Sequence, residues 1–325
     1  MSDRILITGG AGFIGSYLSG KLLEDNYKVT VIDDLSTGSW DNIVEYKNNP
    51  NFRVIISSIM SPGLFELEVQ KHDFVFHLAS AVGVKLIMNE PVKSIENIFT
   101  STGTVLKYCS KYRIPVLITS SSEVYGKSET IPFAEDDDVV MGATSKRRWS
   151  YASAKALDEF LALAHYLETK LDVYVVRLFN TVGPRQTGQY GMVMPTFVNQ
   201  ALKNQPITVY GDGSQKRCFC SVFDVIAGLS RFMNNEEAVG KVINLGSNEE
   251  ISISELADRV ISLTNSKSEI QFIPYDDAYG KGFDDIKRRM PDVSRAKKYL
   301  NWESKYTLDD IIKSIAEYIS KTNKS

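Results

Sequence analysis

A tyrosine and a lysine lie four residues apart, as Tyr151-Ala-Ser-Ala-Lys155, at the start of a predicted helix. Residues at this spacing share one face of a helix. An ammonium group beside a phenol favours the phenolate, so we expect Lys155 to lower a tyrosine pKa that is normally about 10. Such a pair could remove the proton from a sugar hydroxyl while a hydride leaves the same carbon.

Hydroxyl side chains follow a strand predicted over Val116 to Ser120. The segment reads Thr119-Ser-Ser-Ser-Glu-Val-Tyr-Gly126. Ligands of parallel sheets bind at the carboxyl ends of the strands. We therefore expect these hydroxyls to face the same cleft as the tyrosine and lysine pair.

A glycine-rich turn joins the first predicted strand, Arg4 to Thr8, to a helix predicted over Gly15 to Glu24. Its spacing, G-x-x-G-x-x-G, provides a tight turn, a close backbone approach and a helix N-terminus, which a pyrophosphate needs. Asp33 ends the next strand, where a carboxylate binds ribose hydroxyls and repels a 2′-phosphate. The pattern predicts NAD rather than NADP as the cofactor. The turn residues assigned to the cofactor are Gly9, Gly12, Phe13, Ile14 and Gly15.

Short apolar strands alternate with helical stretches in the first half of the chain. This alternation predicts an α/β fold, a Rossmann-type doubly wound parallel sheet with helices on both faces. After about residue 180 the pattern changes, since Gly, Pro and Gln become frequent and shorter elements follow. We expect residues 1–180 to form the NAD-binding domain and 181–325 a smaller substrate-binding lobe that is interleaved with it. The helices expected to border the site run from Val92 to Lys111 and from Ala152 to Glu168.

Composition excludes several classes of protein. The formal charge of −3 offers no basic surplus for nucleic acid. No apolar run is long enough for a membrane span, and the N-terminus lacks the pattern of a signal peptide. The three cysteines cannot all pair, which favours a reducing cytoplasm. Neither the cysteines nor the three histidines show metal-ligand spacing, so no metal is expected.

Several motifs together resemble those of the extended short-chain dehydrogenase/reductase family, which includes nucleotide-sugar epimerases, dehydratases and decarboxylases. They run along nearly the whole chain as TGGAGFIG, SSSEVYG, YASAK, RLFNTVGPR, YGDGSQKRCF and RRMPD. The resemblance implies a nucleoside-diphosphate sugar as substrate, expected to be a UDP-sugar, and a homodimer built on the two helices that border the site.

The resemblance also implies roles for individual residues. Ser121 matches the residue that hydrogen-bonds the C4 oxygen, Tyr151 the general base and Lys155 its partner on the nicotinamide ribose. Two further segments, HLAS and Ser58-Ile59, occupy positions that contact the cofactor in the family, although their sequences differ from the usual ones. By position they assign Ser58, Ile59, Leu78 and Ala79 to the cofactor. Residues assigned to the nucleotide sugar are Asn180, Val193, Met194, Tyr210, Arg217 and Arg289.

Glu123 separates the reactions known for this family. Dehydratases generally carry Asp before this Glu as the acid that expels water, whereas Ser122 stands here. The Ser-Glu pair, the arginine of RRMPD and the segment RWSY resemble UDP-glucuronic acid decarboxylases. That reaction is the leading hypothesis, and a UDP-sugar 4-epimerase is the alternative. A 4,6-dehydratase, a 4-dehydrogenase and a non-catalytic sensor are further alternatives. The basic run 146–148 is interpreted as a solvated loop, from which one arginine could reach an acidic substrate.

Overall fold

A computed structural model describes residues 3–80, 90–188, 192–279 and 286–322. Its centre is a parallel sheet of seven strands in the order β3-β2-β1-β4-β5-β6-β11. β2 and β3 lie on one side of β1, and β4, β5 and β6 lie on the other, so the order of the strands reverses between β1 and β4. The carboxyl ends of these two strands therefore flank a crevice of the type that binds ligands in such sheets. The strands are β1 (Arg4–Thr8), β2 (Lys28–Asp33), β3 (Phe52–Ile56), β4 (Phe74–His77), β5 (Val116–Ser121), β6 (Val173–Leu178) and β11 (Val242–Leu245).

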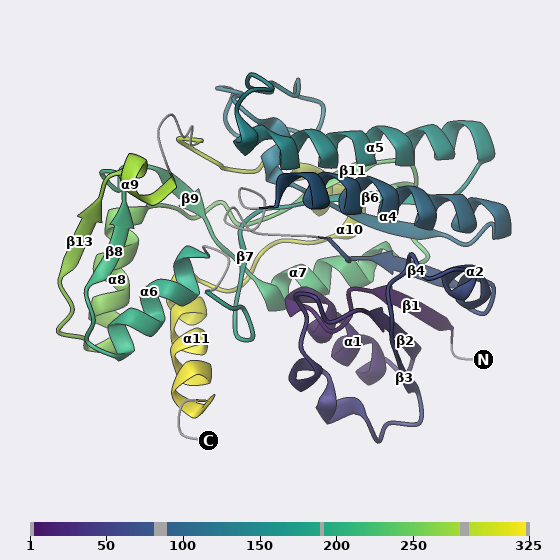
Figure 1. The fold of residues 1–325 in the computed structure, drawn as a ribbon, viewed down its shortest axis with the longest axis horizontal. Helices are drawn as coiled ribbons and strands as arrows, with labels where there is room; N and C mark the ends of the chain where they lie inside the picture. The colour runs from purple at the N-terminus through teal and green to yellow at the C-terminus, as the bar shows by residue number, and fades with distance from the viewer. Residues whose placement is uncertain (1–2, 81–89, 189–191, 280–285, 323–325) are drawn as a thin grey trace.

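Helices cover both faces of this sheet (Figure 1). One face carries α1 (Phe13–Glu24), α7 (Val222–Leu229) and α10 (Ser294–Leu300), and the other carries α2 (Leu64–Val69), α4 (Pro91–Tyr112) and α5 (Ser150–Thr169). Side chains alternate along each strand, so Ile5 and Ile7 pack toward α1 while Leu6 packs into the opposite layer. The predicted α/β class is confirmed, and the two helices expected to border the site begin and end within two residues of the predicted limits.

The smaller lobe has its own apolar core, which includes Phe197, Leu256 and Ile312. Three helices surround it: α6 (Val193–Leu202), α8 (Ile253–Thr264) and α11 (Leu308–Thr322). Strand β8 (Ile207–Tyr210) pairs with β13 (Ile270–Ile273), and β9 (Lys216–Cys218) pairs with β12 (Glu250–Ser252). The helix α9 (Tyr275–Tyr279) follows β13, and the short pair β7 (Thr181–Val182) and β10 (Cys220–Ser221) lies between the lobe and the sheet.

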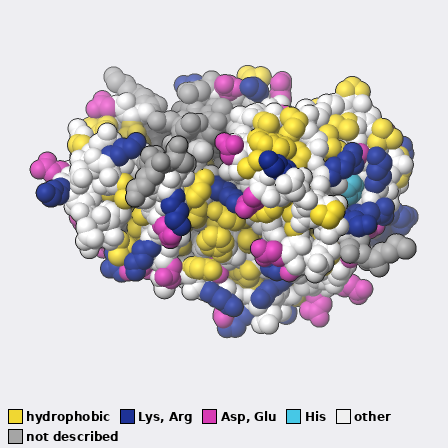
Figure 2. Space-filling view, turned by 90° about the horizontal axis from the view of Figure 1, so that it is seen from below, with side chains coloured by type: hydrophobic (Ala, Val, Ile, Leu, Met, Phe, Trp, Pro, Cys, Tyr) yellow, Lys and Arg dark blue, Asp and Glu magenta, His cyan; other side chains and the backbone are white. Residues whose placement is uncertain are grey.

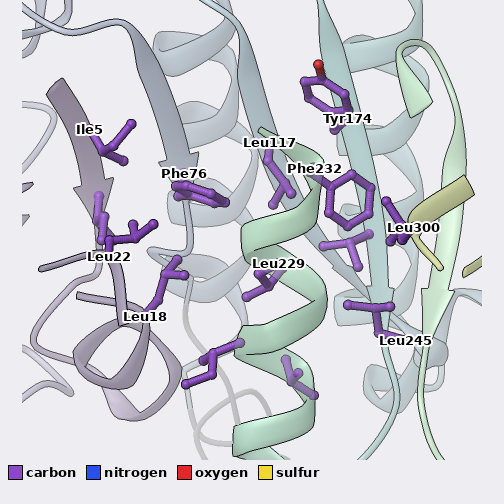
Figure 3. Packing of buried hydrophobic residues seen from close by; sticks show 14 of the residues in the cluster. Ile5, Leu18, Leu22, Phe76, Leu117, Tyr174, Leu229, Phe232, Leu245 and Leu300 are labelled. Carbon is purple, nitrogen blue, oxygen red and sulfur yellow. The ribbon is translucent and has the colours of Figure 1, made fainter. Parts of the chain in front are cut away.

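The later half of the chain also completes the large sheet. β11 pairs with β6, and α7 packs against α1, although both elements follow residue 181. Figure 3 shows Leu229 of α7 close to Leu18 of α1 and to Phe76 and Leu117 of the strands. The two units are therefore interleaved along the chain.

The surface seen in Figure 2 carries basic and acidic side chains interspersed with one another. None of the helices in the described ranges is both long and apolar enough to cross a membrane.

Candidate active site and cofactor site

A cavity of roughly 1240 Å³ lies at the carboxyl ends of the central strands, where the sheet meets the lobe. Every residue that the sequence assigned to cofactor, catalysis or substrate lines it. The cofactor and catalytic sets, from Gly9 to Lys155, come from the carboxyl ends of the first five strands, β1 to β5, and from the starts of α1 and α5. The substrate set comes from the lobe and from the segments that connect the lobe with the sheet.

The glycine turn lets neighbouring backbone segments approach more closely than side chains would allow. Gly9 has a φ of +74°, and a Cβ there would lie 2.7 Å from the amide nitrogen of Ala79. A Cβ on Gly15 would lie 2.2 Å from the carbonyl oxygen of Gly9, so the helix can approach the turn only without one. Gly12 precedes α1 without a side-chain cap, which leaves the first amides of the helix available for an anion.

Asp33 is fixed at the end of β2 by backbone donors. Its Oδ2 accepts from the amide of Ala11 at 2.9 Å and its Oδ1 from the amide of Leu35 at 2.8 Å. Burial raises its pKa, and these hydrogen bonds oppose the rise. Each oxygen keeps a further lone pair, so the carboxylate suits two ribose hydroxyls. Together with the glycine turn, it fits NAD.

Tyr151, Ser121 and Lys155 meet beside this cofactor region. Tyr151 and Ser121 are hydrogen-bonded to each other. Lys155 Nζ donates to the carbonyl oxygen of Thr119 at 3.0 Å and lies 3.4 Å from Oδ2 of Asp158. Burial and the Glu123 carboxylate raise the pKa of Tyr151, which Ser121 partly opposes. The pKa is thus raised and not lowered as expected, because burial and the carboxylates of Glu123 and Asp158 outweigh the opposing effects of Ser121 and Arg289.

Glu123 lies between two guanidinium groups. It belongs to the short helix η3 (Ser122–Tyr125), where its Oε2 pairs with Arg148 at 2.5 Å and its Oε1 with Arg289 at 2.6 Å. Burial disfavours its ionised form, but Arg289, Arg148 and Arg217 outweigh burial and lower its pKa to about 2. Glu123 is consequently an anion and cannot supply a proton near neutral pH.

The substrate set surrounds the other end of the cavity. Asn180 follows β6, and its side-chain amide donates to the carbonyl oxygen of Cys218 at 3.0 Å. Arg217 lies on β9 and is 8% exposed. The lobe contributes the remaining members, Val193 and Met194 from α6 and Tyr210 from β8.

The sequence did not assign Arg148 to the site, although it allowed that one arginine of 146–148 could reach an acidic substrate. The interpretation of 146–148 as a solvated loop is wrong for this arginine, which is 6% exposed and paired with Glu123. It belongs to η4 (Arg147–Trp149), just before α5, where a spacing of three from Tyr151 could have indicated a shared face. Tyr318 and Thr322 of α11 also line the cavity, and no local pattern connects that distant helix with the site.

Comparisons with known proteins agree with this geometry. The sequence model of the family described as GDP-mannose 4,6 dehydratase matches residues 6–315. The chain is 40% identical over 319 residues to a UDP-N-acetyl-alpha-D-glucosaminuronate decarboxylase of Bacillus cytotoxicus, covering 98% of each chain. It is 36% identical to UDP-glucuronic acid decarboxylase 1 of Danio rerio, covering 98% of this chain and 73% of the relative.

A solved structure also superposes along nearly the whole chain. It is the UDP-glucuronic acid 4-epimerase of Bacillus cereus in complex with UDP-glucuronic acid and NAD, with a TM-score of 0.88, 26% identity and coverage of 98% and 99% of the two chains. The chain therefore belongs to the GDP-mannose 4,6 dehydratase family, within the NAD-dependent extended short-chain dehydrogenases/reductases that act on nucleotide sugars.

Proposed function

We propose that this enzyme decarboxylates a UDP-hexuronic acid. The observation that carries the proposal is the pairing of one carboxylate, Glu123, with two buried guanidinium groups, Arg148 and Arg289, in the cavity that contains Tyr151. Two guanidinium groups around one carboxylate leave a positive charge that a second carboxylate can balance. The C6 carboxylate of a uronic acid is such a group.

The first step is oxidation of the sugar at C4. Tyr151 accepts the proton of the C4 hydroxyl, and Ser121 hydrogen-bonds the oxygen as it becomes a ketone. Lys155, already held by Thr119, orients the nicotinamide ribose. The glycine turn and Asp33 would hold NAD, which would supply the hydride acceptor for this oxidation and the hydride donor for the final reduction at C4.

The second step is loss of carbon dioxide. The C4 ketone is β to the carboxylate, so the C5–C6 bond can break with its electron pair delocalised onto the C4 oxygen. Arg289, and Arg148 beside it, would orient the carboxylate for this cleavage. Protonation at C5 and hydride return to C4 follow, and the whole reaction is redox-neutral.

The nucleotide is assigned to the lobe. Arg217 and Asn180 would bind the diphosphate and sugar, since fixed guanidinium donors match phosphate oxygens. Val193, Met194 and Tyr210 would enclose the base. The names of the decarboxylase relatives support UDP as the nucleotide and a uronic acid as the sugar.

The decisive experiment offers the enzyme UDP-glucuronic acid, UDP-N-acetylglucosaminuronic acid and UDP-glucose. We expect carbon dioxide release and a pentose product from at least one acid, and none from UDP-glucose, which lacks the carboxylate. The two acids differ at C2, so their relative kcat/KM identifies the substrate. A product of unchanged mass and inverted C4 from both acids would instead identify a 4-epimerase. Tyr151→Phe serves as the inactive control.

We also propose that the enzyme is a homodimer formed through α4 and α5. These helices pack together, and both expose apolar residues at helical spacing on the outer side of the molecule (Figure 1). A second copy with the same face would bury them in an arrangement of four helices. The exposed apolar residues are Val92, Ile95, Phe99, Leu157, Phe160 and Leu167.

A further inference from the structure

A buried series of hydrogen bonds connects the glycine turn to the catalytic lysine. His77 Nδ1 lies 2.7 Å from Thr8 Oγ1, and its Nε2 lies 3.3 Å from Thr102 Oγ1. Thr102 Oγ1 lies 2.8 Å from Oδ2 of Asp158, the same oxygen that Lys155 Nζ approaches to 3.4 Å. Four elements contribute, β1, β4, α4 and α5, and every member of the series is at most 3% exposed.

The hydrogen bonds in this series have one consistent direction. Burial and the charge of Lys155 lower the pKa of His77 to about 3, so its ring is neutral. Thr102 can satisfy Asp158 only by donating its hydroxyl proton, so its oxygen accepts from Nε2–H of His77. Nδ1 is then the acceptor for the Thr8 hydroxyl. Each donor points toward Asp158, and the series needs an acceptor where it ends.

Stability of helix packing does not explain an aspartate at this position. Asp158 is 1% exposed between α4 and α5, and its Oδ1 lacks a hydrogen-bond partner among the described residues. A buried unsatisfied polar atom costs about 1–3 kcal/mol. Burial raises the pKa of Asp158, opposed by Lys155 and Thr102. An apolar side chain would avoid these costs, so the carboxylate has another role.

We propose that Asp158 is a positioning residue for Lys155. It holds the ammonium group beside the Thr119 carbonyl and compensates part of its positive charge, and it thereby determines the pH at which Tyr151 can act as a base. This inference rests on the roles proposed above for Tyr151 and Lys155. It concerns C4 oxidation and holds for a decarboxylase and an epimerase alike.

The charges around the two groups define the expected effect. Tyr151 faces Glu123 of η3, Arg289 of the segment before α10, and Asp158 of its own helix, on which Lys155 lies four residues further along. Asp158 and Glu123 both raise the pKa of Tyr151, whereas Arg289 lowers it. Asp158 itself faces Thr102 and Lys155, with Glu159 as its neighbour on α5, and the neutral His77 is connected to it only through Thr102.

The test is the pH dependence of kcat/KM for Asp158→Asn. The amide retains an acceptor for Thr102 but removes the negative charge, so the acid limb should move to lower pH by about one unit. The value of kcat at the optimum should fall roughly tenfold, because Lys155 is less firmly held, while KM for the nucleotide sugar stays constant. An acid limb that coincides with that of the unmodified enzyme would overturn the inference.

Glu159→Gln is the matched control. It makes the same change one residue along α5, in a buried carboxylate that pairs with Arg177 at 2.7 Å. It should lower the melting temperature without moving the acid limb. Equal shifts in both variants would mean a general electrostatic effect and would overturn a specific role for Asp158.

Two further variants keep the test decisive. If Asp158→Asn does not fold, Thr102→Val and Thr102→Ser replace it. Thr102→Val removes the hydroxyl donor to Asp158 and should lower kcat, whereas Thr102→Ser retains the donor and should leave kcat unchanged. Equal kcat values for the two variants would contradict the inference. If Tyr151→Phe is inactive and the acid limb of Asp158→Asn is not shifted, only the role of Asp158 is refuted. An active Tyr151→Phe refutes the catalytic assignment and this inference together.

Discussion

Glu123 contributes to stability as well as to the site, because its carboxylate lies between two buried arginines. Glu123→Gln should reduce the free energy of unfolding at pH 7 by about 3 kcal/mol, since it leaves both guanidinium groups without their shared anion. Its pKa is lowered from 4.5 to about 2. The stabilisation is therefore complete above pH 4.5 and is lost as the pH falls toward 2.

Denaturant unfolding curves between pH 7 and pH 3 measure this difference. The gap between the unmodified enzyme and Glu123→Gln should narrow below pH 4.5. Glu317→Gln, which breaks an exposed pair with Lys321, is the control and should change stability little. A gap that stays constant over this range would show that the Glu123 charge is not what stabilises the fold.

Arg289 offers a kinetic test of the proposed reaction. Its assigned partner is the substrate carboxylate and not C4, so Arg289→Ala should slow carbon dioxide release more than C4 oxidation. Reduced cofactor should then accumulate during a single turnover, observed by its absorbance. The neighbouring Arg288→Ala is the control, because Arg288 pairs with Glu250 away from the cavity. Equal slowing of both steps in Arg289→Ala would argue against this role.

Residue types and spacing were sufficient to predict the site residues whose identity is required by the local backbone geometry or by a partner on the same element. Gly9 needs a positive φ, and Tyr151 and Lys155 share one helix face, so the sequence could indicate these positions. Arg148 and Asp158 could not be recognised in this way. Their function depends on partners 25 to 56 residues away, Glu123 and Thr102, whose proximity only the folded chain creates.

At the scale of elements, the alternation of strands and helices predicted a parallel sheet in the first half of the chain, including the strands β1, β2 and β5. The seventh, β11, could not be assigned from the sequence, because it is a four-residue strand separated from β6 by most of the lobe's first half. The cavity could not be predicted from the sequence either. It forms where strand ends from one half meet α6, β8 and α11 of the other, which no local periodicity encodes.

The paired helices α4 and α5 give a prediction about assembly. Phe160 is 69% exposed on the proposed interface, so Phe160→Asp should place a charge against an apolar partner surface and favour the monomer. Sedimentation should give twice the chain mass of 36.4 kDa for the unmodified enzyme and about one chain mass for the variant. Leu67→Asp, at an apolar residue that is 59% exposed but lies on α2, should remain dimeric. A dimeric Phe160→Asp would place the interface elsewhere.

At the scale of the whole molecule, the cofactor-binding half depends on residues from the end of the chain. Leu229 and Phe232 follow the first lobe helix, and Leu300 comes from the last part of the chain, yet all three belong to the same core as Ile5 (Figure 3). Trp302 belongs to this core as well. Trp302 also donates its indole N–H to the carbonyl oxygen of Asp224 at 2.8 Å. From these contacts we expect the two halves of the sequence to unfold as one cooperative unit.

A chain that ends at residue 180 should therefore fail to fold, although it contains the glycine turn, Asp33 and the tyrosine and lysine pair. Its sheet would lack β11, and the side chains of Phe76, Leu117 and Tyr174 that pack beneath α7 and Phe232 would be exposed to water. Burial of each such aromatic or aliphatic side chain contributes about 1.5–3 kcal/mol, so exposing these three would cost roughly 4.5–9 kcal/mol, which is comparable with the 5–15 kcal/mol by which a whole domain is usually stable. We expect neither a cooperative melting transition nor binding of NAD by calorimetry. Co-expression with residues 181–325 should restore both, since it supplies the missing strand and helices. A fragment 1–180 that melts cooperatively and binds NAD alone would show that the later elements cover a sheet already stable without them.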